Sequence, residues 1–426
     1  MPDAETIESP RVAALAQALN AGDPRALAEF WQEVTAKGTP LIEEFGDAAG
    51  VRVTFLWRAE APVERVALIS RLNHQEAAEN RLAHLSDTDL WYRTYTLPRD
   101  TRATYQFWLD DPLEPPGEDT DWAALVAAWR TDPLNPRTYR IPGNKDVPGD
   151  PDWTASVLEG PSAAPEPAIV LRPEGAAGRI EEHRIRSAIL DNERAVWVYT
   201  PPGYRTDGEP YGLLVFFDGR LYQQAVSAPL ILDNLAADGR IPPQVAVFIG
   251  NAGMAARDLE LPCYPPMADF VVQELLPWVR ERYHVTAEPA RSLVAGLSYG
   301  ALAAVFLAWR HPAIFGAVLA QSGSFWWHPD GDPEPEWLTR QLVHGSPEAL
   351  RFYLEVGRFE RQPNGEDGPS QLIATRHLRD VLQAKGYPVA YGEFSGGHDY
   401  LCWQHSLPGA LEALLGGASK SAANTP

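Results

Sequence analysis

The sequence predicts an α/β protein in which a mostly parallel sheet, covered by helices on both faces, follows a smaller β-sandwich. Between Val51 and Leu109, short segments alternate apolar with polar residues and no helical segment separates them, which is typical of an antiparallel sandwich. After residue 168, continuous apolar runs of strand length alternate with segments of helical periodicity. That rhythm is typical of a parallel sheet buried on both faces. The chain has 426 residues, which suits two domains better than one core.

The N-terminal part divides into three predicted segments. Residues 1–36 carry Leu and Ala at helical spacing, and Pro24 is expected to begin a second helix. Residues 37–145 form the predicted β-sandwich, because strand-like runs within them are separated by clusters of turn residues. Residues 146–168 are rich in Pro, Gly and Ala, which predicts a linker between the two domains.

Residues 169–417 form the predicted α/β domain, and residues 418–426 are expected to be a disordered tail. The segment 267–285 has helical periodicity, with Pro277 expected to kink it. Another helix is expected from Ala301 onward, directly after a strand. The strand-like apolar runs are RAVWVYT (194–200), YGLLVFF (211–217), QVAVFIG (244–250), SLVAGL (292–297), GAVLAQSG (316–323), RFYLEVG (351–357) and PVAYGEFSG (388–396).

The composition argues against nucleic-acid and membrane partners. The net charge of −21 is spread along the chain, whereas phosphate binding needs clustered Lys and Arg. No stretch reaches the roughly 20 apolar residues of a membrane span, and the first residues lack the pattern of a secretory signal. Cys263 and Cys402 are too few for a disulfide framework or a four-ligand zinc site. We therefore expect a cytoplasmic protein; the sequence does not indicate its oligomeric state.

The most informative motif is Gly296-Leu297-Ser298-Tyr299-Gly300, which lies between a predicted strand and a predicted helix. A sharp strand-to-helix turn of this G-x-S-x-G type exposes the serine above the sheet, and its glycines allow the backbone to pass close to neighbouring elements. The N-terminus of the following helix favours developing negative charge. The motif predicts an α/β-hydrolase fold with Ser298 as nucleophile and the Tyr299 amide as one oxyanion donor. A glycine-rich turn with a passing serine is the alternative.

In this fold the catalytic acid and then the histidine follow the serine along the chain. His398 follows the last predicted strand and precedes the C-terminal helix, which is the position expected for the general base. The acid should follow the strand RFYLEVG, where Glu360 occurs. Asp367, Glu355 and a Ser–His dyad without an acid remain alternatives, and each carboxylate is also compatible with a structural role.

A second oxyanion donor is expected in the loop after an earlier strand. Here the strand LLVFF runs into Asp218-Gly219-Arg220. The amide of Gly219 or Arg220 is therefore the candidate donor, with a plain turn as the alternative.

Several separated segments together resemble the enterochelin (ferric enterobactin) esterase family. In the C-terminal part these are RDLELPCYPPMADFVVQELLPWVRERYHV from Arg257, the GLSYG turn, SGSFWW (322–327) and GGHDYLCW (396–403). In the N-terminal part, TDLWYRTYTLP (88–98) and DPLNPR (132–137) resemble the β-sandwich domain that precedes the hydrolase domain in that family. The resemblance covers roughly residues 40–415.

This resemblance implies a cytoplasmic serine esterase that hydrolyses the ester bonds of a catechol siderophore trilactone and so helps to release iron. Iron would enter as part of the substrate, and no cofactor is implied. Ser298 and His398 match the family's nucleophile and base. Arg257 and Glu260 match a motif near the active site, where Arg257 either helps to bind the anionic substrate or forms an ion pair with Glu260.

Four further residues are candidates for substrate binding. Trp326 and Trp327 either stack on catechol rings or pack in the core. Arg130 and Arg137 are weaker candidates, which would add positive charge from the N-terminal domain. A ferric tris-catecholate is a trianion, so a protein of net charge −21 needs a local basic patch to bind it. The alternatives are an esterase acting on a hydroxycinnamoyl or aryl ester, and a catalytically inactive binding protein.

Overall fold

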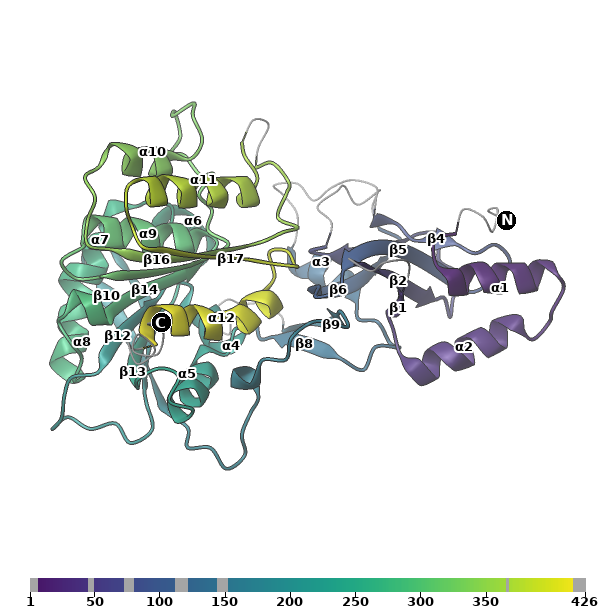
Figure 1. Ribbon diagram of the computed structural model, residues 1–426, viewed down its shortest axis with the longest axis horizontal. Helices are drawn as coiled ribbons and strands as arrows, with labels where there is room; N and C mark the ends of the chain where they lie inside the picture. Colours follow the sequence, from purple (N-terminus) through teal and green to yellow (C-terminus); the bar gives the residue numbers. More distant parts are fainter. Residues whose placement is uncertain are drawn as a thin grey trace, which may run out of the picture. The chain divides into compact units, whose positions relative to one another are not determined.

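The computed structural model describes residues 7–44, 50–72, 80–111, 122–143, 152–364 and 368–416. The chain forms two compact units (Figure 1). The first comprises Met1–Pro165 together with Ser395–Leu401, and the second comprises Glu166–Phe394 together with Cys402–Pro426. The short segment Ser395–Leu401 thus belongs by its contacts to the first unit, although its neighbours along the chain belong to the second.

Two helices open the first unit, α1 (Pro10–Asn20) and α2 (Ala26–Lys37). Ser9 caps α1, because its Oγ accepts a hydrogen bond from the amide of Val12, and Pro10 at the first helical position has no amide to leave unpaired. Both helices fall where the residue spacing predicts them. Their apolar faces share one core with residues of the adjacent sheet, namely Val12, Leu15, Phe30, Trp31, Val34, Leu41, Leu56 and Leu90.

Two antiparallel sheets complete the first unit and confirm the predicted sandwich. Aromatic rings join the sheets: the ring centroids of Phe55 and Tyr105 are 4.7 Å apart, and those of Trp57 and Phe107 are 5.3 Å apart. The first sheet has the strand order β1 (Leu41–Glu44), β2 (Gly50–Arg58), β5 (Leu90–Pro98), β4 (Ala83–His84). The second has the order β3 (Val66–Ser70), β6 (Arg102–Leu109), β9 (Trp153–Glu159), β8 (Thr138–Ile141), and β7 (Trp129–Arg130), which follows α3 (Trp122–Ala128), also pairs with β6.

The structure corrects the linker predicted over residues 146–168. Strand β9 lies inside that range and pairs with both β6 and β8, so that Glu159 is opposite Arg102. Proline and glycine on both sides of β9 give the segment a linker composition, although it is a strand hydrogen-bonded to β6 and β8. The sandwich therefore extends to about residue 159, and the first unit ends at Pro165.

The second unit is built on an eight-stranded sheet of the predicted kind. Its first three strands in spatial order are paired antiparallel, and the remaining pairs are parallel. The edge strand β10 was not predicted, because its sequence RIEEHRIRS is charged and largely exposed and so lacks an apolar run. The spatial order is β10 (Arg179–Ser187), β11 (Asn192–Thr200), β13 (Gln244–Ile249), β12 (Gly212–Phe216), β14 (Ser292–Leu297), β15 (Ala317–Gln321), β16 (Arg351–Gly357), β17 (Val389–Phe394).

Helices cover both faces of this sheet (Figure 1). One core joins alternate residues of the central strands to the apolar sides of α8, α9 and α11. The strands β12, β13, β14 and β15 are buried along their whole length, as a sheet covered on both faces requires. The helices are α4 (Gly219–Gln224), α5 (Ala228–Ala237), α6 (Met254–Glu260), α7 (Pro265–Asp269), α8 (Leu276–Arg282), α9 (Tyr299–Arg310), α10 (Trp337–His344), α11 (Gln371–Ala384) and α12 (Tyr400–Leu415).

The segment 267–285, predicted as one helix kinked at Pro277, has a wider turn at its centre. A π-helical stretch, η4 (Phe270–Leu275), connects α7 to α8. Pro277 lies in the first turn of α8, where a missing amide is tolerated. The irregularity therefore lies just before the proline. Among the described residues, no helix is both long and apolar enough to cross a membrane.

Candidate active site

Ser298 lies in a sharp turn between β14 and α9, as the motif predicts. Its backbone has φ 55° and ψ −122°, a conformation that non-glycine residues rarely adopt. The turn is held on both sides, because the Ser298 amide donates to the carbonyl oxygen of Gln321 at 3.0 Å and its own carbonyl accepts from the Ser324 amide at 3.1 Å. The Ser298 side chain is half-buried, and its Oγ lies 3.4 Å from Oγ of Ser324.

The two glycines of the motif are required by the packing of this turn. A Cβ at Gly296 would overlap the carbonyl group of Gly300, and a Cβ at Gly300 would lie 2.9 Å from Oδ2 of Asp218. The backbone of the turn therefore passes closer to its neighbours than any side chain allows. The strand, turn and helix together hold Ser298 in the geometry of a nucleophile elbow.

Two helix N-termini hold the predicted oxyanion donors. Tyr299 is the first residue of α9, and Gly219 is the first residue of α4. Gly219 follows Asp218, which has a left-handed backbone conformation with φ 51°. A Cβ at Gly219 would overlap the backbone of Phe248 in β13, so this position also needs glycine. First-turn amides have no partner within their own helix, which suits both residues to the role of donor to a developing oxyanion.

Arg257 pairs with Asp218, for which the sequence predicts no role. Nε of Arg257 donates to Oδ1 of Asp218 at 2.7 Å, and an Nη nitrogen donates to Oδ2 at 2.9 Å. Asn251 adds a hydrogen bond to Oδ1 at 2.7 Å, and the Asp218 side chain is fully buried. The guanidinium of Arg257 also lies over the ring of Tyr299, 5.7 Å from its centroid. The position of Asp218, between the end of a predicted strand and the candidate oxyanion residue Gly219, was the feature of the sequence that could have indicated a role for it.

Glu260 belongs to a different ion pair, which corrects the pairing with Arg257 that the sequence left open. Its carboxylate accepts from Arg194 at 2.9 and 3.0 Å and from Nδ2 of Asn192 at 2.7 Å. The side chains of Glu260 and Arg194 are 5% and 0% exposed, so the pair lies in the interior. Glu260 therefore neutralises Arg194 in the interior of the protein. A residue that binds substrate would have to be exposed, and Glu260 is not.

The two predicted tryptophans differ in their surroundings, although both are half-buried. The Trp326 ring lies 6.0 Å from that of Tyr299, and its Nε1 donates to Gln371 at 2.6 Å. Trp327 packs edge-on against Trp337, with ring centroids 6.1 Å apart. Trp326 is thus beside Tyr299, the residue after Ser298, whereas Trp327 contacts the start of α10.

Glu360 follows β16, where the catalytic acid was expected. It is buried, and its Oε1 accepts hydrogen bonds from Oγ of Ser322 at 2.6 Å and from the Gly357 amide at 2.7 Å. Ser322 follows β15 and in turn accepts from Nε1 of Trp403 at 3.0 Å. These bonds fix one carboxylate oxygen of Glu360 at the ends of two neighbouring strands.

The alternative carboxylate Glu355 lies deeper, inside β16. Its Oε1 accepts from Nε2 of Gln321 at 2.7 Å and from Oγ of Ser406. Burial, reinforced by the nearby charge of Glu360, raises the pKa of Glu355 to about 7. Its hydrogen bonds bind β15, β16 and α12 together, which indicates a structural role. Asp367, the remaining alternative, lies outside the described residues.

His398 lies in the segment Ser395–Leu401, between β17 and α12, as predicted. Its side chain is half-buried, whereas the residues on either side of it, Gly397 and Asp399, are buried. The contacts of this segment are those of the first unit.

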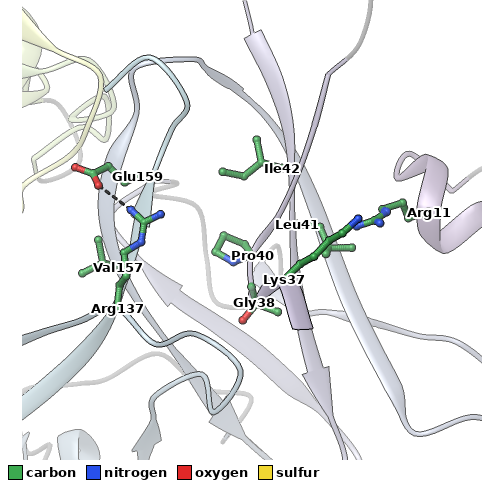
Figure 2. Close-up of a pocket in the computed structure, with 10 residues that line it drawn as sticks. Arg11, Lys37, Gly38, Pro40, Leu41, Ile42, Arg137, Val157 and Glu159 are labelled. Carbon is green, nitrogen blue, oxygen red and sulfur yellow. Dashed lines mark hydrogen bonds and ion pairs between the residues drawn. The ribbon is translucent and has the colours of Figure 1, made fainter. Parts of the chain in front are cut away.

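The two arginines suggested in the N-terminal domain have partners within the first unit. Arg130 donates to backbone carbonyls of Ala127 and Trp129. Arg137 lines a cavity of about 270 Å³ and donates to Glu159 at 2.8 Å. Figure 2 shows this ion pair on one side of the cavity and two further cations, Arg11 and Lys37, on the other; both of these pair with Glu33. Each cation of this cavity thus has a carboxylate partner, and two carboxylates, Glu33 and Glu159, offset part of the charge of the three cations.

Two family models match the chain. Residues 187–414 match the family described as "Putative esterase", and residues 52–169 match the family described as "Enterochelin esterase, N-terminal". The chain is 30% identical over 433 residues to an iron(III) enterobactin esterase of Dickeya dadantii, which covers 93% of this chain and 94% of that protein. It is 28% identical over 427 residues to an iron(III) salmochelin esterase of Escherichia coli, covering 95% and 98% of the two chains.

Solved structures of the same kind are similar over most of the chain. The ferric enterobactin esterase of Salmonella typhimurium superposes with a TM-score of 0.75 at 29% identity, covering 91% of this chain and 98% of that one. The enterobactin esterase of Shigella flexneri, solved in the presence of enterobactin, gives a TM-score of 0.71 at 29% identity, covering 91% and 97%. Both units of the chain therefore have counterparts in these proteins.

Proposed function

Because this chain belongs to the enterochelin esterase family, and is therefore an ester hydrolase, we propose that its substrate is a catechol siderophore trilactone. Hydrolysis of the trilactone esters would weaken the hold of the siderophore on iron and help to release it. The observation that carries this proposal is the similarity to iron(III) enterobactin esterases over 93% of the chain, which includes both the sandwich and the catalytic unit.

We propose that Ser298 attacks an ester carbonyl of the trilactone. His398 takes the proton from the Ser298 hydroxyl, and the oxyanion accepts hydrogen bonds from the amides of Tyr299 and Gly219. His398 then protonates the leaving seryl hydroxyl, which leaves an acyl group on Ser298. Water then attacks the acyl carbonyl as His398 takes its proton; the bond from the carbonyl carbon to Oγ of Ser298 breaks, and His398 returns the proton to Oγ, which releases the acid and restores the serine. The proposed steps use only side chains, backbone amides and water.

Glu360 is the proposed acid of this system. Two observations support this role: Glu360 follows β16, and its carboxylate is buried and held by hydrogen bonds from Ser322 and Gly357. A buried carboxylate in that place stabilises the imidazolium that forms during proton transfer. Iron is cargo in this proposal, carried by the substrate.

Substrate binding must overcome the net charge of −21. Arg257 is the proposed ligand for the anionic substrate, but its charge is shared with Asp218, so the pair carries no net charge. Trp326, half-buried beside Tyr299, is the proposed surface for stacking a catechol ring. Aromatic stacking attracts the substrate without depending on the electrostatic field of the whole protein.

A cytoplasmic location is also part of this proposal, and fractionation of the expressing cell would test it.

The test is product analysis after incubation with ferric and iron-free catechol trilactone. Ser298→Ala is compared with the parent protein and with Ser292→Ala, a matched control at the other end of β14, where the hydroxyl donates only to a backbone carbonyl. Linear trimer, dimer and monomer should appear with the parent and with Ser292→Ala, and be nearly absent with Ser298→Ala.

Two other outcomes would replace the proposal. An intact trilactone together with rapid hydrolysis of an aryl or hydroxycinnamoyl ester would keep the ester chemistry and reject the siderophore. Failure of Ser298 to react with a fluorophosphonate probe, which labels activated serines, would favour an inactive binding protein.

A further inference from the structure

The segment that carries His398 is bound to the sandwich on both sides of the histidine. On the N-terminal side, the Arg102 amide donates to the carbonyl oxygen of Ser395 at 3.0 Å. Next to the histidine, a Cβ at Gly397 would overlap the carbonyl group of Arg71, so these two backbones are in direct contact. Arg71 directly follows β3, and Arg102 begins β6, which pairs with β3. One end of this sheet therefore forms the support of the segment.

On the C-terminal side, Asp399 is held by a strand residue of the sandwich. Its Oδ2 accepts two hydrogen bonds from Thr104 of β6, from the backbone amide at 2.6 Å and from Oγ1 at 2.9 Å. Its Oδ1 accepts from the Leu401 amide at 3.0 Å, in the first turn of α12. Asp399 is 3% exposed, and burial raises the pKa of its carboxyl group.

If the buried carboxylate of Asp399 moved, it would lose its three hydrogen bonds, and no water would replace them. The free energy lost in this way is larger than that lost when a hydrogen bond at the surface breaks. The residues immediately before and after His398 are thus both fixed to the sheet of β3 and β6. Fixing both neighbours fixes the backbone of His398, and leaves its side-chain torsions as its main freedom.

We propose that Thr104 and Asp399 are positioning residues for the general base, so that the sandwich takes part in catalysis by holding the His398 segment. This proposal rests on the proposed function only in taking His398 as the base, whatever the ester substrate. Proton transfer from a serine requires the imidazole within hydrogen-bond reach, and small misplacements lower the rate steeply. Thr104 touches no reacting atom in this proposal; it acts through Asp399 on the position of His398.

The decisive variant is Thr104→Val in the full chain, because valine keeps the shape of threonine and removes only the hydroxyl donor. We expect kcat to fall about 10-fold with KM changed less than about twofold, since misplacement of a catalytic group by 1 Å costs up to roughly 100-fold. Thr104→Ser restores the donor and should recover most of the rate. Asp399→Ala removes all three bonds and should lower kcat further; if it fails to fold, Thr104→Val still decides.

The matched control is Thr54→Val. Thr54 is also a buried strand threonine of the sandwich, but it lies in the sheet that does not contain Thr104, where its hydroxyl is 2.9 Å from that of its neighbour Thr94. This variant should lose as much thermal stability as Thr104→Val and keep its kcat within about twofold of the parent. A merely structural role of Thr104 would give the two variants the same kinetics, which would overturn the proposal.

The rate of Ser298 labelling by a fluorophosphonate separates this inference from the choice of substrate. Labelling needs the activated serine but no siderophore, so Thr104→Val should slow it about as much as it lowers kcat. A parent protein that is labelled but leaves the trilactone intact would reject the substrate and leave this test valid. Equal labelling rates for the parent and Thr104→Val would overturn the positioning role, and so would a parent that is not labelled at all.

Discussion

The carboxylate of Asp218 accepts two parallel hydrogen bonds from the guanidinium of Arg257, at 2.7 and 2.9 Å. Asp218 immediately precedes Gly219, and the Arg257 guanidinium lies over the ring of Tyr299. This single ion pair therefore connects the two segments whose amides are the proposed oxyanion donors. A bidentate pair of this kind fixes orientation as well as distance.

Removal of Arg257 should destabilise the protein and slow catalysis together. Arg257→Ala leaves a fully buried carboxylate without its main partner, which costs about 3 kcal/mol in the free energy of unfolding. Displacement of an oxyanion donor should lower kcat about 100-fold. Arg257→Lys keeps the charge but not the bidentate geometry, and should recover only part of either loss.

The control for this prediction is Arg172→Ala. Arg172 makes an equally bidentate pair with Asp238, at 2.7 and 2.8 Å, but both side chains are about one-third exposed. Loss of an exposed pair should change stability by no more than about 1 kcal/mol. Urea unfolding of both variants checks the difference, and equal losses would contradict the structural importance of the Asp218–Arg257 pair.

Substitution of the two buried carboxylates by glutamine should separate the catalytic acid from a structural neighbour. Glu360→Gln can still accept from Ser322 and Gly357 but carries no charge to stabilise an imidazolium, so kcat should fall about 1,000-fold. Glu355→Gln should change kcat less than about fivefold, because its partners Gln321 and Ser406 are themselves structural. Steady-state kinetics on an aryl ester measures both variants. A loss below about 10-fold in Glu360→Gln would favour a Ser–His dyad.

The stability of the protein should depend on pH through Glu355. Burial raises its pKa to about 7 in the folded protein, against roughly 4.3 in an unfolded chain. Between these values the folded state keeps a proton that the unfolded state has lost, so the free energy of unfolding falls as pH rises. At about 1.4 kcal/mol for each unit of pKa difference, the total loss is about 4 kcal/mol, and it is nearly complete by about pH 8.

Glu355→Gln tests this dependence, because glutamine has no proton to lose. The stability of the variant relative to the parent should increase by about 3 kcal/mol from pH 4.5 to pH 7.5. Urea unfolding at the two pH values measures the change. A difference between variant and parent that stays constant with pH would show that Glu355 does not titrate in this range.

Local patterns made much of the fold predictable. Strand β14 was predicted at its observed bounds, because six apolar or small residues run directly into the G-x-S-x-G turn. The strands β9 and β10 were not found, since one is surrounded by proline and glycine and the other is charged and exposed. Neither sequence shows a clear strand pattern of its own: β9 is determined by its pairing with β6 and β8, and β10 by its hairpin with β11, in which Ser187 lies opposite Asn192.

The candidate site shows the same division between local and distant information. Ser298 and His398 follow from a motif and a position between elements, and both lie where the sequence predicts them. The pairing of Arg257 with Glu260 was considered because both residues match one motif of the enterochelin esterase family. The actual partner, Asp218, lies 39 residues earlier, just after the end of β12, and only the fold brings it to Arg257 in α6. Long-range pairing of this kind cannot be read from one sequence.

Gly296, two residues before the proposed nucleophile Ser298, provides a last test of the elbow geometry. A Cβ at Gly296 would overlap the carbonyl group of Gly300, so Gly296→Ala must push the first turn of α9 away from β14. We expect a loss of about 3 kcal/mol in the free energy of unfolding, and a larger relative loss in the rate at which a fluorophosphonate labels Ser298. The rate suffers more because α9 carries both the nucleophile turn and the Tyr299 amide.

Gly208→Ala is the matched control, because a Cβ there meets no atom within 4 Å. It should keep the labelling rate and the stability of the parent, the latter within about 0.5 kcal/mol. If Gly296→Ala is labelled as fast as Gly208→Ala, the close approach of β14 and α9 is not needed for the reactivity of Ser298. If it folds but is not labelled, the close packing of this turn is what makes the serine a nucleophile.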